Sequence, residues 1–238
     1  MTLRERVAAG DLLLGAFLAL GSPVAAEALA LAGFDWLLVD LEHGAGGEAA
    51  LLAQLQAAAA GGAPALVRVE SGEPARAARA LDLGAAGVMC PRVDSAAQAA
   101  AWAGAVRGRG MAAATRAAGY GLAAPQASPL VVVQIESPVA VAAAEEIAAT
   151  DGVDALFVGP TDLAHALGRP RDLGDEALRA AVRCVAGAGK PAGLYAVTPA
   201  EVAFARAEGL RFVAAGSDLT HMLAAARATI SACATTNS

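Results

Sequence analysis

Residues 32–43 read AGFDWLLVDLEH, and this stretch contains the pattern that decides the fold. A helical, Ala-rich segment ends at Gly33, four apolar residues follow from Trp36 to Val39, and charged residues come directly after them. Glycine often ends helices because it adopts the left-handed conformation at little steric cost. A strand that is apolar at every position is typical of a parallel sheet covered on both faces. The stretch therefore predicts a helix end, a buried parallel strand and a polar loop.

The same unit recurs along the whole chain. Candidate strands lie near residues 12–20, 35–40, 64–69, 87–92, 130–136, 154–159, 191–197 and 211–215. Helical patterns begin near Pro23, Glu48, Pro74, Ser95, Pro138, Asp175 and Pro199, and an eighth runs over 220–231. Strict alternation of eight strands with helices predicts one α/β domain over 1–238, folded as a (β/α)8 (TIM) barrel. An open doubly wound sheet is the alternative that the pattern leaves.

Composition excludes several classes of partner. The net charge is −6, and among 17 basic residues Lys190 is the single lysine, so no basic stripe for nucleic acid is present. The three cysteines are widely spaced and form no CxxC pair, as expected in a reducing cytoplasm. We expect a cytoplasmic protein that acts on a small molecule.

The amino-terminal region could imitate a secretory signal, because Arg4 and Arg6 precede the apolar run 12–20. Glu5 and Asp11 argue against this interpretation, and the run is also the first strand of the predicted barrel. No uninterrupted apolar run reaches the roughly 18 residues of a membrane span. We therefore expect no signal and no membrane partner.

The segment between Arg107 and Leu130 interrupts the alternation. It is rich in Gly, Ala, Pro and Ser, and it contains Arg109, Arg116 and Tyr120. Long loops in compact domains are usually functional or disordered. We expect this one to reach either the catalytic mouth or a neighbouring subunit.

Catalytic residues of such barrels come from the carboxyl ends of the strands and the loops that follow. Glu136 and Asp162 each follow a strongly apolar strand, where a lone carboxylate is costly to desolvate. Two carboxylates with water and substrate oxygens suit Mg or Mn. We therefore predict a metal pair, with helix capping by both residues as the alternative.

Two basic groups occupy equivalent positions. His43 follows Asp40 and Glu42 after a strand, where an imidazole can act as base or acid near neutral pH, although it could also be an ordinary surface residue. Arg68 ends its strand and needs an anionic partner. That partner is either a substrate carboxylate or enolate held in a bidentate grip, or an internal residue such as Glu70 or Glu73.

The turn 159–162 and Lys190 bear on the mechanism. The turn could offer backbone N–H groups of Thr161 and Asp162 to an anion, although four residues are a weak signal. Lys190 precedes a strand and so lies at the amino end of the barrel. A lysine imine mechanism requires a lysine at the other end, so we do not expect one.

Five motifs together resemble the HpcH/HpaI family of class II pyruvate aldolases. They are residues 34–43, 66–68, 81–85, 134–137 and 157–163, in the family's order and spacing, and the resemblance runs from about Gly15 to Asp218. It implies a (β/α)8 barrel of the phosphoenolpyruvate/pyruvate type, assembled as a homo-hexamer with the last helix exchanged between neighbours. It also implies reversible cleavage of 4-hydroxy-2-oxo acids to pyruvate and an aldehyde, through an enolate stabilised by Mg, Mn or Co.

The resemblance also implies a role for individual residues. Glu136 and Asp162 would bind the metal, and Arg68 would stabilise the pyruvate enolate. His43 would transfer protons with Asp40 beside it, and Asp82 would raise the basicity of that histidine. The residues expected to contact substrate are Gln134, Gly159, Pro160, Thr161, Asp162 and Arg68.

The chain departs from the family pattern at two places. Residues 107–111 are shorter than the usual Gly- and Arg-rich loop, and Thr161 stands where Ala or Asn is common. Both departures concern substrate selection. An acyl-CoA lyase of the malyl-CoA or citramalyl-CoA type shares the barrel and the acidic pair, and a non-catalytic barrel used as a scaffold is a further alternative.

Overall fold

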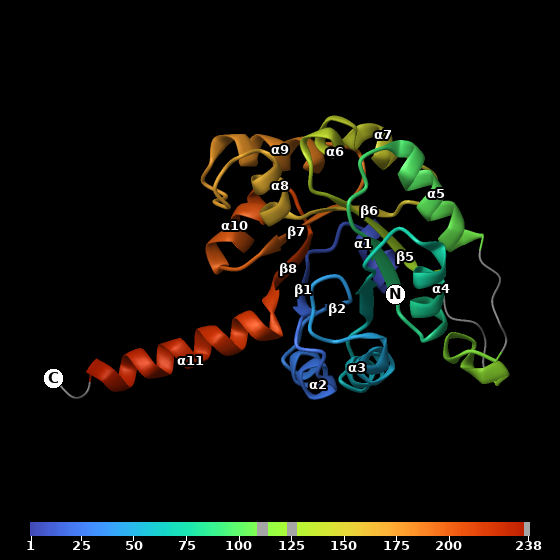
Figure 1. Cartoon of the computed structure of the whole chain (residues 1–238), viewed down its shortest axis with the longest axis horizontal. Coiled ribbons are helices and arrows are strands. Elements are labelled where there is room, and N and C mark those ends of the chain that lie inside the picture. Colours follow the sequence, from blue (N-terminus) through green and yellow to red (C-terminus); the bar gives the residue numbers. More distant parts are fainter. Residues whose placement is uncertain (109–113, 123–127, 236–238) are drawn as a thin grey trace.

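Eight parallel strands close into a barrel in the computed structural model of the chain, which describes residues 1–108, 114–122 and 128–235 (Figure 1). The strands are β1 (Leu13–Leu18), β2 (Trp36–Asp40), β3 (Ala65–Arg68), β4 (Gly87–Cys90), β5 (Leu130–Ile135), β6 (Ala155–Val158), β7 (Ala192–Ala196) and β8 (Phe212–Ser217). Each strand pairs with the next along the chain, and β1 pairs with β8 through Leu13 and Phe212. The predicted barrel is confirmed, and the open sheet is wrong.

Helices cover the outside of the barrel. They are α2 (Pro23–Leu31), α3 (Glu48–Ala60), α4 (Pro74–Asp82), α5 (Ala96–Arg107), α6 (Pro138–Ala142), α7 (Ala144–Ala149), α8 (Pro160–Ala166), α9 (Glu176–Ala186) and α10 (Pro199–Ala207). Several begin with Pro after a Ser or Thr cap, which satisfies free N–H groups of the first turn. The one helix expected to begin near Pro138 is divided into two short helices, α6 and α7. Helix α8 is an additional short helix directly after β6.

Aromatic rings fill the interior of the barrel. Trp36 stacks on Phe212 with ring centroids 4.1 Å apart, and Phe157 meets both rings edge-on. Gly15 makes room for the indole, because a Cβ on it would lie 2.1 Å from Trp36 Cε2. The short helix α1 (Leu3–Ala8), which the sequence did not predict, closes the amino end with Leu3 and packs with this interior cluster. The interior is a packed core, so the open end is the one at the carboxyl ends of the strands.

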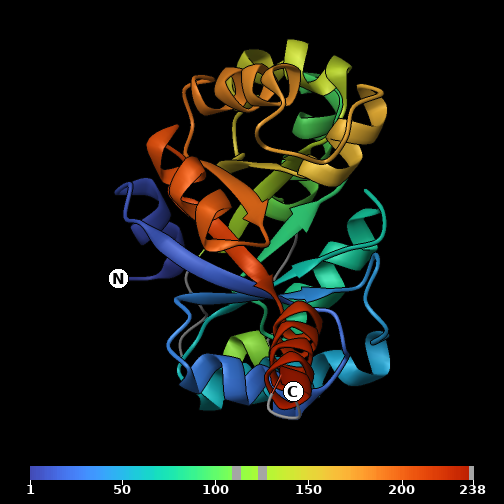
Figure 2. The ribbon, with the colours of Figure 1, turned by 90° about the vertical axis from the view of Figure 1, so that its left-hand side faces the viewer.

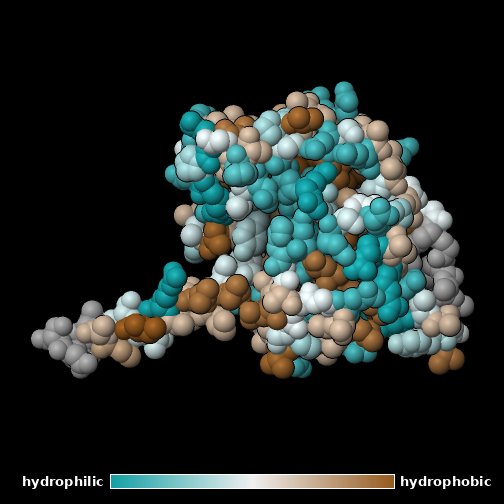
Figure 3. Space-filling view, viewed as in Figure 1, coloured by the Kyte–Doolittle hydropathy of each residue, from teal (hydrophilic) through white to brown (hydrophobic). Residues whose placement is uncertain are grey.

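The last helix leaves the barrel. Helix α11 (Asp218–Thr235) follows β8 and projects away from the body of the molecule (Figures 1 and 2). Figure 3 shows apolar residues along this projection, and Met222, Leu223 and Ile230 are exposed. The predicted eighth helix is therefore present, but it does not cover the barrel of its own chain.

The segment that interrupts the alternation is only partly described. Arg109 lies outside the described residues, whereas η1 (Arg116–Gly121) is a short 3-10 helix. Arg116 Nη1 donates to the carbonyl of Leu83, which follows α4 on the way to the amino end of β4. This described part therefore lies away from the catalytic mouth, contrary to the first of the two expectations. Among the described residues, no helix is long and apolar enough to cross a membrane.

Candidate active site

Asp40 and Arg68 form an ion pair at the carboxyl ends of β2 and β3. The two residues are register partners on neighbouring strands, and both are buried. Arg68 Nε and Nη2 donate to Asp40 Oδ1 and Oδ2 at 2.9 and 2.7 Å, and Arg68 Nη1 lies 3.3 Å from Glu42. Burial acts to lower the pKa of Arg68, but Asp40 and Glu42 outweigh it and hold the pKa above its usual range. The guanidinium is therefore a fixed positive charge.

Arg68 therefore makes an internal ion pair, which was one of its two interpretations. Its partners are Asp40 and Glu42 rather than Glu70 or Glu73. The reason is register, because Asp40 lies directly opposite Arg68 in the sheet. Arg68 also lines the central cavity and presents a fixed positive charge there.

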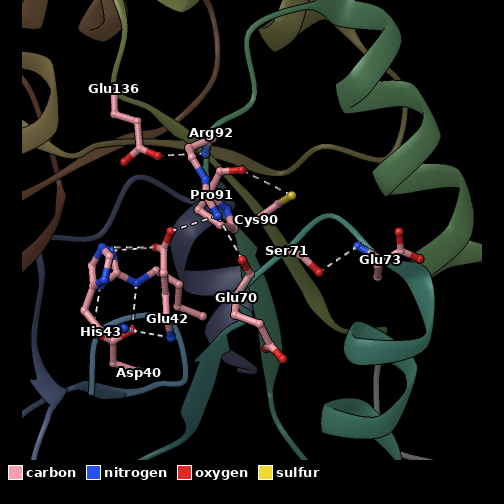
Figure 4. A network of polar contacts seen from close by, with 11 residues as sticks. Asp40, Glu42, His43, Glu70, Ser71, Glu73, Cys90, Pro91, Arg92 and Glu136 are labelled. Atoms are coloured by element: carbon pink, nitrogen blue, oxygen red, sulfur yellow. Dashed lines mark hydrogen bonds and ion pairs between the residues drawn. The ribbon is translucent and has the colours of Figure 1, made fainter. Parts of the chain in front are cut away.

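Asp40 also shapes the loop that carries His43. Its Oδ1 accepts hydrogen bonds from the backbone N–H groups of Glu42 and His43 at 3.1 and 3.2 Å (Figure 4). The His43 side chain is 63% exposed, and its Nε2 lies 3.8 Å from Glu42 Oε2. Exposure alone would fit a surface histidine, but His43 lines the central cavity with Arg68. The geometry thus gives it access to a ligand.

Asp82 is not brought to His43 within one chain. It is the last residue of α4, which leads to the amino end of β4, whereas His43 follows the carboxyl end of β2. The two residues therefore lie toward opposite ends of the barrel. Within the described residues of this chain, the carboxylate beside the imidazole is Glu42.

Glu136 directly follows β5 and is buried. Its Oε1 accepts a 2.7 Å hydrogen bond from the backbone N–H of Arg92 (Figure 4). Burial raises the pKa of Glu136 from 4.5 to about 7; the charges of Asp162 and Glu42 also raise it, while the Arg92 N–H and Arg68 act to lower it. The surroundings of Glu136 therefore favour the neutral, protonated carboxyl over the carboxylate.

Neither carboxylate caps a helix. Ser137 is the N-cap of α6 and accepts from the N–H of Ala140, and Gly159 is the N-cap of α8. Asp162 lies inside the first turn of α8 and shares a cavity with Glu136. The capping interpretation is therefore wrong for both residues.

The surroundings of Glu136 fit a hard divalent cation. A Cβ on Gly159 would lie 2.8 Å from Glu136 Oε2 and 2.9 Å from Gln134 Nε2, so only glycine leaves these groups their space. Gln134 Oε1 is buried and has no hydrogen-bond partner in the described structure. Mg and Mn prefer oxygen ligands and commonly use one or two carboxylates, leaving other positions to water and substrate. Glu136 and Asp162 line one cavity and would be the charged ligands. Among the described residues there is no cluster of three or more His, Cys, Asp or Glu.

A cavity of about 270 Å³ lies at the carboxyl ends of the strands, and it shares His43 and Asp162 with the cavity that Glu136 lines. Predicted residues that line it are Asp40, His43, Arg68, Gln134, Gly159, Pro160, Thr161 and Asp162. The other lining residues, which the sequence did not single out as site residues, are Phe17, Ala19, Phe157, Tyr195 and Ser217. Phe17 and Tyr195 meet edge to face with centroids 5.0 Å apart, and they make one side of the cavity apolar. Phe17 and Tyr195 lie near the carboxyl ends of β1 and β7, and this position could have identified them as cavity residues from the sequence.

Comparison with known proteins supplies the family. The sequence profile described as HpcH/HpaI aldolase/citrate lyase matches residues 13–225, which is most of the chain. The chain belongs to the HpcH/HpaI family. It is accordingly a carbon–carbon lyase, and the resemblance found in the motifs is confirmed.

Named relatives cover nearly the full length of this HpcH/HpaI chain. It is 43% identical over 245 residues to the hydroxypyruvate/pyruvate aldolase of Paraburkholderia phytofirmans, covering 94% of each chain. It is 42% identical to the 2-dehydro-3,6-dideoxy-6-sulfogluconate aldolase of Pseudomonas putida, covering 90% of this chain and 89% of the relative. A crystal structure of an HpcH/HpaI family protein from Burkholderia cenocepacia superimposes with a TM-score of 0.90 at 36% identity, covering 97% and 98%. These are full-length similarities in both sequence and fold.

The buried carboxyl of this HpcH/HpaI protein predicts how the metal-free fold responds to pH. The pKa of Glu136 is higher in the folded chain than its usual 4.5, so its protonation stabilises the fold. That contribution is complete below pH 4.5 and is lost as the pH rises to about 7. Its size is about 3 kcal/mol, which corresponds to roughly 6–12 °C in Tm.

The measurement is Tm in chelator, at fixed protein concentration, for the natural protein and for Glu136→Gln. The glutamine keeps an oxygen for the Arg92 N–H but carries no charge, so the variant should gain Tm relative to the natural protein between pH 5 and pH 8. Parallel pH curves for the two proteins would contradict the burial of a charged Glu136.

Proposed function

We propose that this enzyme reversibly cleaves 4-hydroxy-2-oxo acids to pyruvate, or a close 2-oxo acid such as hydroxypyruvate, and an aldehyde, and that it requires Mg, Mn or Co. The observation that carries the proposal is a pair of cavities that share His43 and Asp162. Arg68 lines one of them, and Glu136 lines the other. Relatives named as aldolases of pyruvate, hydroxypyruvate and keto sugar acids support this class of substrate.

Each residue has a chemical task in the cleavage direction. His43 accepts the proton of the 4-hydroxyl group as the bond between C3 and C4 breaks and the aldehyde forms. The electron pair moves toward the 2-oxo oxygen, where the positive charge of Arg68 stabilises it. A proton then returns to C3 and completes pyruvate. Asp40 holds Arg68 and the His43 backbone in place for both steps.

A divalent cation, when bound, would supply a Lewis acid for the 2-oxo acid. Glu136 and Asp162 would hold it, and Gln134, with its unpartnered Oε1, would contact the substrate beside it. Gly159, Pro160 and Thr161 would form the wall on the same side. Thr161 adds a hydroxyl that can donate to or accept from the aldehyde portion.

The experiment is a cleavage assay with two substrates, and it has three possible outcomes. Release of pyruvate from a 4-hydroxy-2-oxo acid, with added Mg, Mn or Co and without coenzyme A, is the expected result. Cleavage of a malyl-CoA-type thioester in place of the free acid would identify an acyl-CoA lyase. Turnover of neither substrate would identify a barrel used for binding or as a scaffold.

We further propose that the enzyme is a homo-hexamer in which α11 packs on a neighbouring chain. The exposed apolar residues Met222, Leu223 and Ile230 support this, because a projecting apolar helix is expected to be buried against a partner. A neighbouring copy would also be the only source of an Asp82 that could act on His43, because the two lie toward opposite ends of one chain.

Assembly gives a measurable prediction. Sedimentation at micromolar concentration should report six chains of 23.4 kDa, about 140 kDa, with closed symmetry. The pair Met222→Glu and Leu223→Glu should shift the protein to smaller species, whereas Arg227→Glu on the same helix is the matched control for added negative charge. A natural protein that sediments as a monomer would contradict the proposal.

A further inference from the structure

Arg92 has an unusual backbone conformation next to the candidate metal ligands. It lies two residues after β4 and has φ +54°, and in the described chain Tyr120 is the other non-glycine residue with positive φ. Residues other than Gly, Asn and Asp seldom adopt this left-handed conformation, and when they do the surrounding structure must enforce it. Such strain clusters at functional sites.

The left-handed turn aims the Arg92 N–H at Glu136. The donor and Oε1 are 2.7 Å apart, and within the described residues this is the one hydrogen bond to the Glu136 carboxylate (Figure 4). The next N–H, of Val93, donates to the carbonyl of Gln134 at 3.3 Å. The turn is therefore docked on the end of β5, and it leaves Oε2 facing Gly159.

The Arg92 side chain holds the turn from the other direction. Its Nη2 donates to the carbonyl of Glu70 at 2.9 Å and lies 3.3 Å from Glu42 Oε1. Figure 4 shows the guanidinium reaching toward Glu70 and Glu42 while the backbone N–H points to Glu136. One residue thereby connects the loops after β2, β3 and β4 to the end of β5. These contacts offset the cost of the left-handed backbone.

We propose that Arg92 is a positioning residue, whose left-handed backbone orients the Glu136 carboxylate for a divalent cation. The guanidinium acts indirectly, by stabilising that conformation, and does not bind the substrate. The inference rests on the proposed function, because it takes Glu136 as a ligand.

Two matched pairs of variants separate the backbone from the side chain. Arg92→Gly and Arg92→Ala both remove the guanidinium and keep the N–H, but glycine adopts positive φ freely. Arg92→Asn and Arg92→Gln are both neutral amides, and Asn tolerates the left-handed region far better. The Asn and Gln variants keep a polar side chain at the loop surface, so they test the inference even if Arg92→Ala does not fold. Tyr120→Gly is the control, because it also replaces a left-handed residue with glycine but does so in η1.

The readout is the Kd of Mn measured by calorimetry on the full-length protein, with Tm as a check of folding. The Gly and Asn variants should bind Mn more tightly than their Ala and Gln counterparts by about five- to tenfold, given the cost of a left-handed residue. Tyr120→Gly should leave Kd unchanged. Equal Kd values within each pair, or tighter binding by Ala and Gln, would overturn the inference.

Failure of this inference can be distinguished from failure of the proposed function. If the natural protein binds Mn and Glu136→Gln weakens binding, the proposed function stands, and the paired variants decide on Arg92 alone. If the natural protein does not bind Mn, the metal assignment fails and Arg92 has no ligand to position. A change confined to KM for charged aldehydes, with Kd for Mn constant, would assign the guanidinium to substrate binding and would also overturn the inference.

Discussion

Arg68→Lys is expected to lower kcat/KM for aldol cleavage by about 10²-fold, the loss typical of removing one donor to a developing negative charge. Arg68 spans two buried carboxylates, Asp40 and Glu42, and still lines the cavity. A lysine keeps the charge, but it cannot reproduce the planar fork that fixes both partners. The charge would therefore no longer be held where the 2-oxo oxygen becomes negative. Steady-state kinetics with a 4-hydroxy-2-oxo acid measures the loss.

Arg68→Ala is the less informative change. It would leave the buried Asp40 without its cation, which typically costs about 3–5 kcal/mol of stability. Activity and folding would then fall together. Arg6→Lys is the matched control, because Arg6 also spans two carboxylates, Asp11 and Asp35, at the amino end of the barrel. A kcat/KM near the natural value for Arg68→Lys, or an equal loss for Arg6→Lys, would contradict the role of Arg68.

Asp162→Asn is expected to weaken binding of Mn by at least about 10²-fold and to remove cleavage activity at ordinary metal concentrations. The change keeps the size of the side chain and one oxygen, but it deletes one of the two carboxylates proposed as metal ligands. High concentrations of Mn should recover part of the activity, because the lost property is affinity. Calorimetry and metal titration of the rate measure the two effects.

The control for this change is Asp151→Asn, an exposed aspartate in the turn before β6. It should leave both Kd and rate unchanged. Lys190→Ala should also be silent, because Lys190 precedes β7 at the amino end. Natural affinity for Mn in Asp162→Asn would remove Asp162 from the metal site.

Much of the fold could be predicted because the repeated unit carries its own signals. The apolar strand 36–39, with a glycine before it and Asp40 after it, identifies both the strand and the catalytic end. Interactions that depend on register or conformation were harder to predict. Asp40 and Arg68 end neighbouring strands, yet their pairing needs the barrel register, which the pattern does not state.

Other features had no signal in the sequence. The spacing of residues in helix α11 does not show that it leaves the barrel, and its exchange between neighbours was implied by the family resemblance alone. Arg92 follows a proline in an unremarkable polar loop, and positive φ in an arginine has no compositional mark. Glu42 was visible beside His43, but its partners Arg68 and Arg92 lie at the end of β3 and in the loop after β4. Long-range geometry, rather than residue type, determines these roles.

The central claim is that this aldolase uses a divalent cation held by Glu136 and Asp162, and not a lysine imine, to activate the 2-oxo acid. The most direct measurement is the initial rate of 4-hydroxy-2-oxo acid cleavage after treatment with chelator, followed by addition of Mg, Mn or Co. We expect the rate to fall to background in chelator and to return with the added metal. A full rate in chelator would contradict it.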